Sequence, residues 1–326
     1  MDLQAKPIVR ALDPRHRGLR LTSLGSQQAY QQHRERVRHQ RQDNRLFERR
    51  LLPARDEPFG YRGYCHNCRT MVDLEVDFQH AYPIAGVLTP NWRERLECPR
   101  CRLNNRMRAV RHLFDLQCRP QERASIYITE QTTPLYRAIK SNHPHTKGSE
   151  YLGDTIDPGR QINGIRHESL TDLSFKSNRF QHIICCDVLE HIPNYKQALS
   201  ECNRCLKPGG TLLLTVPFSA ASATTIVRAQ RLASGAIEHL LPPEYHGDPI
   251  NPKGCLCFYH FGWDILDHLR QAGFDRPHAQ LVWSKRHGYL GDDQFVFIAR
   301  KHESRWLPAV PAARKRHRPP GNNQAD

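Results

Sequence analysis

Short apolar runs alternate with amphipathic stretches between residues 122 and 300. The apolar runs have the length of strands and predict strands at 125–130, 151–154, 164–167, 180–186, 211–216, 279–283 and 294–299. Stretches with apolar residues at helical spacing predict helices at 134–140, 194–206 and 262–272. Strands that alternate with helices indicate βαβ units, in which helices cover both faces of a parallel sheet. The pattern therefore predicts a doubly wound α/β domain with a mostly parallel sheet.

The two ends of the chain lack this alternation. Residues 1–58 are rich in Arg and Gln, and their few apolar residues hold no steady helical stripe, so we predict a basic arm that is helical or disordered. Residues 302–326 contain a basic run and predict a disordered tail.

The formal net charge of +15 is concentrated in these ends. Residues 1–56 carry 13 Lys or Arg against 6 Asp or Glu, whereas residues 122–300 carry 19 against 18. A basic arm is a possible contact for nucleic acid, although charge runs are more often solvated. No apolar run reaches the roughly 18–20 residues of a membrane span, and the first residues lack the apolar region of a signal peptide. We therefore expect a cytoplasmic protein that does not contact a membrane.

Four of the eleven cysteines form two Cys-x2-Cys pairs, Cys65 with Cys68 and Cys98 with Cys101. Without a secretion signal, cysteines indicate thiols and metal rather than disulfides. Two such pairs complete a tetrahedral Zn2+ site, and four thiolates leave no open coordination position. We predict a structural zinc in a zinc-ribbon-like module over residues 59–121; a redox pair and free thiols are the alternatives. His66 could replace a thiolate but is not needed.

Two segments of the α/β region carry a more specific signature. Residues 187–191 read Asp-Val-Leu-Glu-His, and residues 207–210 read Lys-Pro-Gly-Gly before the run at 211–216. Together with the preceding strand they resemble the region around the fourth and fifth strands of class I S-adenosylmethionine-dependent methyltransferases of the type 11 group. The resemblance covers about residues 122–300. It implies a Rossmann-like methyltransferase domain over 122–301, with a seven-stranded sheet and S-adenosylmethionine as cofactor.

The resemblance also implies which side chains face the cofactor. Ligands of doubly wound sheets bind beyond the carboxyl ends of the strands, and acids follow the first four predicted strands, namely Glu130, Asp154, Glu168 and Asp187. By resemblance, Asp154 accepts both ribose hydroxyls, and Glu168 or the adjacent Ser169 lies near the adenine. Asp187 and His191 border the methionine end and the substrate. For any one acid alone, an ordinary solvated carboxylate is the alternative.

The first loop departs from the family pattern of acid-x-Gly-x-Gly. Here Glu130 is followed by Gln131, Thr132, Thr133 and Pro134, so the acid is kept and both glycines are absent. Side chains occupy space that glycine leaves open. Thr132 or Thr133 would cap the next helix, with Pro134 in its first turn. Either the loop takes a different path around the cofactor, or cofactor binding has been lost.

The long segment 219–262 follows the predicted strand at 211–216, where class I methyltransferases often carry substrate-recognising insertions. Loops of this length are usually functional or disordered. His246 and His260 are candidates for a general base, and a structural histidine within a packed lid is the alternative for each. The sequence leaves the catalytic residue unknown.

The sequence therefore predicts an S-adenosylmethionine-dependent methyltransferase with an unidentified acceptor. A small-molecule or glycan-type acceptor is preferred because the central region is nearly neutral. One alternative is an RNA or protein methyltransferase that uses the zinc module and the basic arm; Arg106, Arg108 and Arg111 would then contact phosphates, or equally an acidic patch of the α/β domain. The other is a non-catalytic methyltransferase-like binding protein with a decayed cofactor loop.

Overall fold

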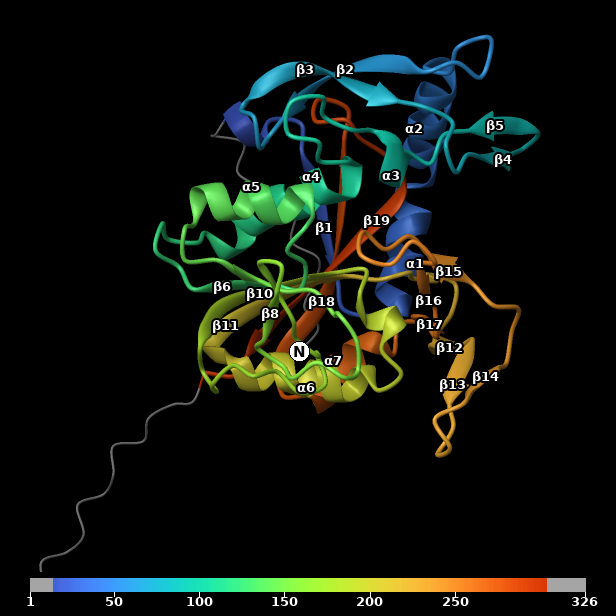
Figure 1. Ribbon diagram of the computed structural model, residues 1–326. Coiled ribbons are helices and arrows are strands. Elements are labelled where there is room, and N and C mark those ends of the chain that lie inside the picture. The colour runs from blue at the N-terminus through green and yellow to red at the C-terminus, as the bar shows by residue number, and fades with distance from the viewer. Residues whose placement is uncertain (1–13, 304–326) are drawn as a thin grey trace, which may run out of the picture.

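A seven-stranded sheet lies at the centre of the computed structural model, which describes residues 14–303 (Figure 1). Residues 1–13 of the predicted arm and 304–326 of the predicted tail lie outside the described residues. In spatial order the strands are β1 (Arg20–Leu24), β18 (Phe274–Ser284), β19 (Tyr289–Lys301), β11 (Leu206–Thr215), β10 (Phe180–Cys186), β6 (Ile126–Ile128) and β7 (Lys147–Gly148).

The sheet has a parallel half and an antiparallel half. Strands β7, β6, β10 and β11 pair in parallel, whereas β19, β18 and β1 are added to β11 by antiparallel pairing. In the parallel half, consecutive residues of β11 are buried because both faces of the sheet are covered. Leu212 and Leu214 belong to the core on one face, and Leu213 to the core on the other. The predicted doubly wound α/β fold is confirmed.

Helices cover both faces of the parallel half (Figure 1). One core includes residues of α6 (Tyr195–Cys205) and α7 (Ile265–Gln271), and the other includes residues of α4 (Asn105–Leu113) and α5 (Pro134–Asn142). A short π-helical turn, Phe114–Cys118, extends α4, and single helical turns lie at Pro14–His16 and Leu189–His191.

Two of the predicted strands are displaced. The second strand is β7, so residues 151–154 follow it as a loop rather than forming it. The third predicted strand contributes only a bridge from His167 to Glu150 and the small hairpin of β8 (Gln161–Ile162) and β9 (Ile165–Arg166). The seventh strand is instead β1, which belongs to the predicted arm and pairs with the edge of β18. Because β1 has few apolar residues, its stability comes from backbone pairing that no local pattern reveals.

Within the described part of the arm, β1 is followed by two helices that contact the sheet. Helix α1 (Gln27–Arg36) begins at Ser26, which accepts a hydrogen bond from the backbone N–H of Ala29 at 3.1 Å, and α2 is Arg38–Arg50. The Tyr30 hydroxyl donates to Asp293 of β19 at 2.7 Å, and Arg41 pairs with the same carboxylate. Part of the arm's positive charge is thus neutralised within the chain.

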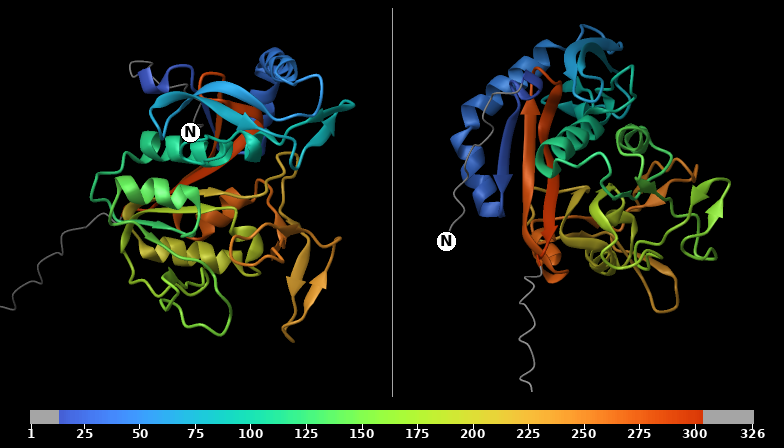
Figure 2. Two further views of the ribbon diagram at one scale, coloured as in Figure 1. Left: turned by 45° about the horizontal axis from the view of Figure 1, so that its top comes forward. Right: turned by 90° about the vertical axis from the view of Figure 1, so that its left-hand side faces the viewer.

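The Cys-rich module lies at the far end of the long β18–β19 hairpin (Figure 2). It consists of the hairpin β2 (Phe59–Cys65) and β3 (Thr70–Val76), the hairpin β4 (Tyr82–Ile84) and β5 (Val87–Thr89), α3 (Trp92–Arg95) and the start of α4. The tip of the β18–β19 hairpin is inserted into it. The buried Arg108 donates to the backbone carbonyls of His287 and Gly288 at this tip, and Asn105 donates to that of Leu290.

The segment 219–262 is built from three short two-stranded ladders beyond β11. They pair β12 (Ile226–Val227) with β17 (Tyr259–His260), β13 (Ala229–Arg231) with β14 (Ile237–His239), and β15 (Tyr245–His246) with β16 (Cys255–Leu256). The backbone N–H of Phe258 donates to the carbonyl of Glu190 at 2.7 Å, which ties this insertion to the end of the parallel sheet. Within residues 14–303, no helix combines the length and apolar character that a membrane crossing requires.

Gly288 lies in the tip of the β18–β19 hairpin, and a substitution there tests how closely this tip packs against the Cys-rich module. A Cβ atom added there would lie 2.5 Å from the Leu74 side chain and 3.0 Å from that of Leu96, and the backbone φ is +60°. Gly235 is a matched control, because its φ is +85° but no atom lies within 4 Å of an added Cβ. We expect Gly235→Ala to lower the free energy of unfolding by about 1 kcal/mol, and Gly288→Ala by about 1–3 kcal/mol more. Urea unfolding measures both, and equal losses would contradict the described packing.

Candidate functional site

A cleft of about 1510 Å³ opens at the carboxyl ends of the parallel strands. Its walls come from three parts of the chain: the loops after β6, β7, β10 and β11, the Cys-rich module, and the insertion at 219–262. All six residues predicted to face a cofactor line it, namely Glu130, Asp154, Glu168, Ser169, Asp187 and His191. Of the two candidate bases, His246 lines the cleft, and His260 is not part of its lining.

The glycine-free first loop follows a path set by Glu150. One carboxylate oxygen of Glu150 accepts hydrogen bonds from the backbone N–H groups of Gln131 and Thr132, at 2.7 and 2.8 Å, and from the Thr132 hydroxyl at 2.8 Å. Thr133 then caps α5, since its hydroxyl accepts from the backbone N–H of Tyr136 at 3.2 Å. The loop therefore turns its amides toward the end of the neighbouring strand.

Glu150, and not Asp154, is the acid at the end of the second strand. It lies two residues after β7, whereas Asp154 lies in a turn farther along with 72% of its side chain exposed. Asp154 contacts the Tyr151 hydroxyl and lies 3.8 Å from Arg231 of the insertion. The placement of Asp154 at a strand end was wrong because the apolar run at 151–154 was read as the strand itself.

Glu130 ends β6 as a buried acid with an unpartnered oxygen. Its Oε1 has no hydrogen-bond partner among the described residues. Burial raises the pKa of Glu130 to about 7, and the nearby Arg106 only partly opposes this shift. A buried carboxylate oxygen without a donor is suited to a positively charged ligand group in the cleft.

Glu168 and Ser169 were left as alternatives by the sequence. The Glu168 side chain is fully buried, pairs with Arg166 at 2.6 Å, and accepts from the backbone N–H and hydroxyl of Ser174 at 2.9 and 2.7 Å. These contacts already use both carboxylate oxygens. Ser169 is half-buried, and its hydroxyl contacts that of Thr171 at 2.9 Å.

Asp187 is held by two arginines of the Cys-rich module. Arg93 donates to both of its carboxylate oxygens at 2.9 Å, and the Nε of Arg106 lies 3.0 Å from one of them. Glu94 balances these cations through Arg93 and through Arg106 at 3.1 Å. Burial alone would raise the pKa of Asp187, but Arg106 and Arg93 outweigh it and hold the pKa below its usual range.

The arginines after the second Cys pair are engaged within the chain. Arg106 meets the acidic patch of the α/β domain that the sequence allowed, Arg108 binds backbone carbonyls, and Arg111 pairs with Asp115 at 3.2 Å. Arg93 is not predictable from the sequence, because neither its neighbours nor its spacing distinguish it from a surface residue.

The four cysteines converge as a set of metal ligands. The sulfurs of Cys65 and Cys101 are 3.7 Å apart and those of Cys68 and Cys98 are 3.8 Å apart, and all four lie within 4.8 Å of one another. A tetrahedral zinc with Zn–S bonds of about 2.3 Å separates its sulfurs by about 3.8 Å. The residues therefore fit a zinc ion. His66 pairs with Asp115 at 2.9 Å instead of joining this set.

The two candidate bases share one partner. The Nε2 atoms of His246 and His260 lie 2.9 and 3.0 Å from the same oxygen of Glu244. Contacts with Cys257 and then with Glu190 raise the pKa of His246 to about 11. Near neutral pH this environment favours the protonated imidazole, which cannot accept a proton as a general base.

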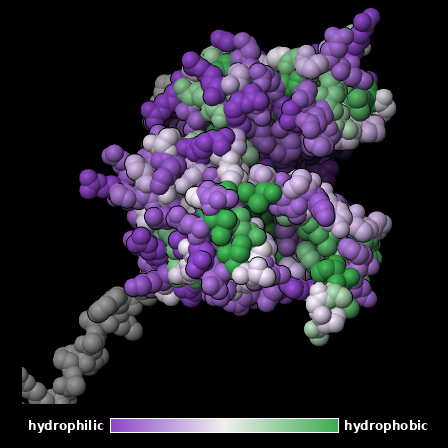
Figure 3. Space-filling model, in the orientation of Figure 1, coloured by the Kyte–Doolittle hydropathy of each residue, from purple (hydrophilic) through white to green (hydrophobic). Residues whose placement is uncertain are grey.

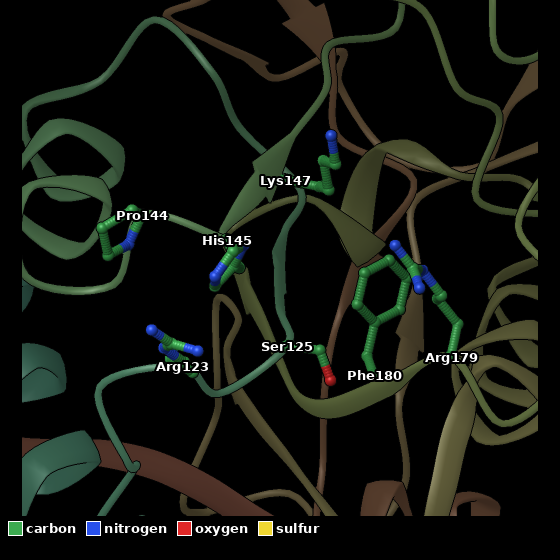
Figure 4. Close-up of a pocket in the computed structure, with 7 residues that line it drawn as sticks. All are labelled: Arg123, Ser125, Pro144, His145, Lys147, Arg179 and Phe180. Atoms are coloured by element: carbon green, nitrogen blue, oxygen red, sulfur yellow. The ribbon is translucent and has the colours of Figure 1, made fainter.

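A smaller hollow of about 410 Å³ lies at the opposite end of the same strands (Figure 4). Lys147 and Phe180 begin β7 and β10 there, whereas the cleft lies where these strands end. Its Arg, Lys and His residues are exposed to solvent, namely Arg123, His145, Lys147 and Arg179. Since ligands of doubly wound sheets bind at the carboxyl ends of strands, the larger cleft is the candidate site.

The ion pairs of Arg93 and Arg106 with Asp187 lead to a prediction about stability. Arg106 is 12% exposed at its side chain and Arg93 is 37% exposed. Removing the buried partner of a carboxylate costs about 3–5 kcal/mol, whereas an exposed partner contributes less than about 1 kcal/mol. We expect the decrease in the free energy of unfolding, measured in urea, to be about three times larger for Arg106→Met than for Arg93→Met. Equal effects would contradict the expectation that the less exposed arginine contributes more to stability.

Comparison with known proteins adds a family assignment. Residues 149–214 match the family model described as a methyltransferase domain. None of the curated proteins compared with the chain matches it.

Several solved structures are similar in part. One is the 1,6-didemethyltoxoflavin-N1-methyltransferase of Burkholderia thailandensis, with 17% identity over 60% of this chain and 78% of that chain, and a TM-score of 0.36. Others are an S-adenosylmethionine-dependent methyltransferase of Mesorhizobium loti, with 15% identity over 57% and 95% of the two chains and a TM-score of 0.34, and one of Methanosarcina mazei, with 17% identity over 58% and 97% and a TM-score of 0.34.

These TM-scores are below 0.5, so the assignment depends on the sequence match and on the fold. The matched segment contains the second strand's terminal acid, the Asp187–His191 motif and the Lys-Pro-Gly-Gly turn before the buried part of β11. The strand order and the cleft at the strand ends agree with it. The chain therefore contains a methyltransferase domain, which the family match places over residues 149–214.

Proposed function

We propose that the cleft holds S-adenosylmethionine against the ends of β6, β7 and β10 and transfers its methyl group to a small polar acceptor, of small-molecule or glycan type. The observation that carries the proposal is the convergence of strand-end acids on one cleft, with Glu130 lacking a partner for one oxygen. Bound S-adenosylmethionine supplies an electrophilic methyl group on a sulfonium.

Each strand end has a distinct part in holding the cofactor. Glu150 uses one oxygen to fix the first loop, which leaves Oε2 to accept the ribose hydroxyls. Glu130 receives the ammonium of the methionine portion, and the half-buried Ser169 lies beside the adenine. Asp187 holds Arg93 and Arg106 at the methionine end, so that its role is to position the module's cations.

The acceptor enters between the module and the insertion. On this side the cleft is lined by Tyr245, His246 and Asn194, together with Arg93 of the module. Apolar side chains gather over the insertion, whereas the module above it is mostly hydrophilic (Figure 3). A mixed polar and apolar lining of this size suits a small molecule or a sugar. Correct alignment of nucleophile, methyl group and leaving sulfur supplies up to roughly 7–11 kcal/mol of catalysis in favourable cases.

We further propose that zinc bound by Cys65, Cys68, Cys98 and Cys101 is structural. The sulfur spacing supports it, and a closed set of four thiolates leaves no position for a reacting group. The site secures the loop that leads into α4, and α4 carries Arg106 to the cleft. A nucleic-acid acceptor is less well supported, because Arg106, Arg108 and Arg111 are engaged within the chain.

The correction at the second strand predicts which acid binds the ribose. We expect Glu150→Gln to weaken binding of S-adenosylmethionine at least about tenfold, because an amide keeps the loop contacts but loses one oxygen acceptor for the hydroxyls. Asp154→Asn is the matched control and should change affinity less than about twofold. Calorimetric titration measures both, and the reverse order would contradict the proposed role of Glu150.

The raised pKa of Glu130 predicts a pH dependence of cofactor binding. Only the ionised carboxylate attracts an ammonium, so affinity should fall about tenfold per unit as pH decreases below about 7 and level off above it. Glu130→Gln should bind more weakly at pH 8 and lose this slope. Fluorescence or calorimetric titration between pH 5.5 and pH 8.5 measures the effect. An unchanged slope in the variant would exclude Glu130 as its origin.

A further inference from the structure

Three possible metal ligands meet where the insertion closes onto the strand ends. Glu190 and His191 belong to the turn after β10, and His246 ends β15 of the insertion. The Oε1 atom of Glu190 lies 3.6 Å from Nε2 of His191 and 3.6 Å from Nδ1 of His246. These ligand atoms lie within 4.8 Å of one another. All three residues line the cleft, far in sequence from the four cysteines.

Each imidazole has a hydrogen-bond partner at the ring nitrogen that faces away from Glu190. This contact orients the other ring nitrogen toward Glu190. Nδ1 of His191 lies 2.8 Å from the carbonyl oxygen of Leu256, which can only accept, so this nitrogen carries the proton and Nε2 presents a lone pair. Nε2 of His246 lies 2.9 Å from Oε1 of Glu244, and donation there leaves a lone pair on Nδ1 when the imidazole is neutral, as it is in a metal ligand. Such outer acceptors are a regular feature of metal-ligating histidines.

In the described part of the chain, Glu190 has no donor within hydrogen-bond distance of either carboxylate oxygen; its nearest partners are the imidazoles of His191 and His246, each 3.6 Å from Oε1. Its side chain is 0% exposed, and neither Oε1 nor Oε2 has a hydrogen-bond partner among the described residues. A buried carboxylate without a partner carries a large desolvation penalty. When both imidazoles are neutral, their lone pairs facing Oε1 add to that penalty unless a cation lies between them.

We propose that Glu190, His191 and His246 bind a divalent transition-metal ion, with zinc the simplest candidate. Two imidazoles and one carboxylate are the ligand set of several catalytic zinc sites, which keep a further position open. In a tetrahedral site with bonds of about 2.1 Å, ligand atoms are about 3.4 Å apart, close to the 3.6 Å that separates Glu190 Oε1 from each imidazole nitrogen. The open position faces the cleft, because all three ligands line it.

A protonated His246 alone explains the arrangement less well. A charged imidazole donating to a carboxylate brings the two atoms to about 2.7–2.9 Å, shorter than the 3.6 Å between Nδ1 and Glu190. The neighbouring group of Glu244, Cys257 and His260 is also a poorer metal site. One Glu244 oxygen is already occupied by both histidines, and neither of its oxygens is a buried atom without a partner.

A metal at this place would act on the acceptor, and this consequence rests on the proposed function. An acceptor hydroxyl bound at the open position loses its proton to water more readily, because the metal stabilises the resulting oxyanion. The oxygen then forms a bond to the methyl carbon, and the electron pair of the breaking carbon–sulfur bond stays on sulfur. The proposal therefore favours oxygen acceptors.

Metal stoichiometry tests the site without any need for methyl transfer. The full chain is stripped with a chelator, reloaded with zinc by equilibrium dialysis without S-adenosylmethionine, and analysed by mass spectrometry for zinc per chain. We expect two zinc ions in the unaltered chain and one in His246→Ala and in Glu190→Gln. His246 is 29% exposed at its side chain, and Glu190→Gln preserves shape, so circular dichroism should show both variants folded.

Three further variants test whether the second zinc ion is held by the proposed ligands. His260→Ala should keep two zinc ions, because His260 lies outside the proposed ligand set. Cys98→Ser should lose the other ion and keep this one. Glu244→Gln should weaken the affinity for the second ion about 10- to 100-fold, as outer-shell partners do.

One zinc in the unaltered chain, or two in folded Glu190→Gln and His246→Ala, would overturn the proposal. Loss of the ion in His260→Ala would assign it to the neighbouring group instead. Cofactor titration on the same samples separates the two hypotheses, since failure to bind S-adenosylmethionine would overturn the proposed function and leave the metal count unaffected.

Discussion

The ion-pair bridge from Arg93 and Arg106 to Asp187 is the constraint on which the site depends. Asp187 directly follows strand β10, and both arginines come from the Cys-rich module. A buried carboxylate is stable only with good partners, so the module must dock in one orientation for the strand end to remain charged. This requirement makes the module one wall of the cleft at the strand ends.

The other walls of the cleft are also held in place by contacts between segments that are distant in sequence. The β18–β19 hairpin reaches into the module and binds Arg108, so the sheet itself carries the module. At the end of the second strand, Glu150 holds the glycine-free first loop in place through two of the loop's backbone amides. The insertion is tied to the next turn through the carbonyl of Glu190. The cleft is therefore assembled from distant segments rather than from one continuous domain.

The sequence predicted what depends on local pattern. The buried runs of β10 and β11 and the Asp187–His191 motif were readable because periodicity and short spacing determine them. Strand β1 and Glu150 were not, since the first depends on pairing with β18 and the second on where a two-residue strand ends. The role of Arg93 was not predictable, because its partner Asp187 is 94 residues away in the sequence. Long-range contacts, not missing motifs, account for the differences.

The central claim is that the module and the sheet form one cooperative unit around the cofactor. Differential scanning calorimetry of the full, zinc-loaded chain, with and without S-adenosylmethionine, tests it most directly. The account predicts a single transition whose calorimetric and van't Hoff enthalpies agree, and which moves as a whole to higher temperature when the cofactor is added. Two transitions, of which only one responds to the cofactor, would contradict it, because the module would then unfold independently of the cleft.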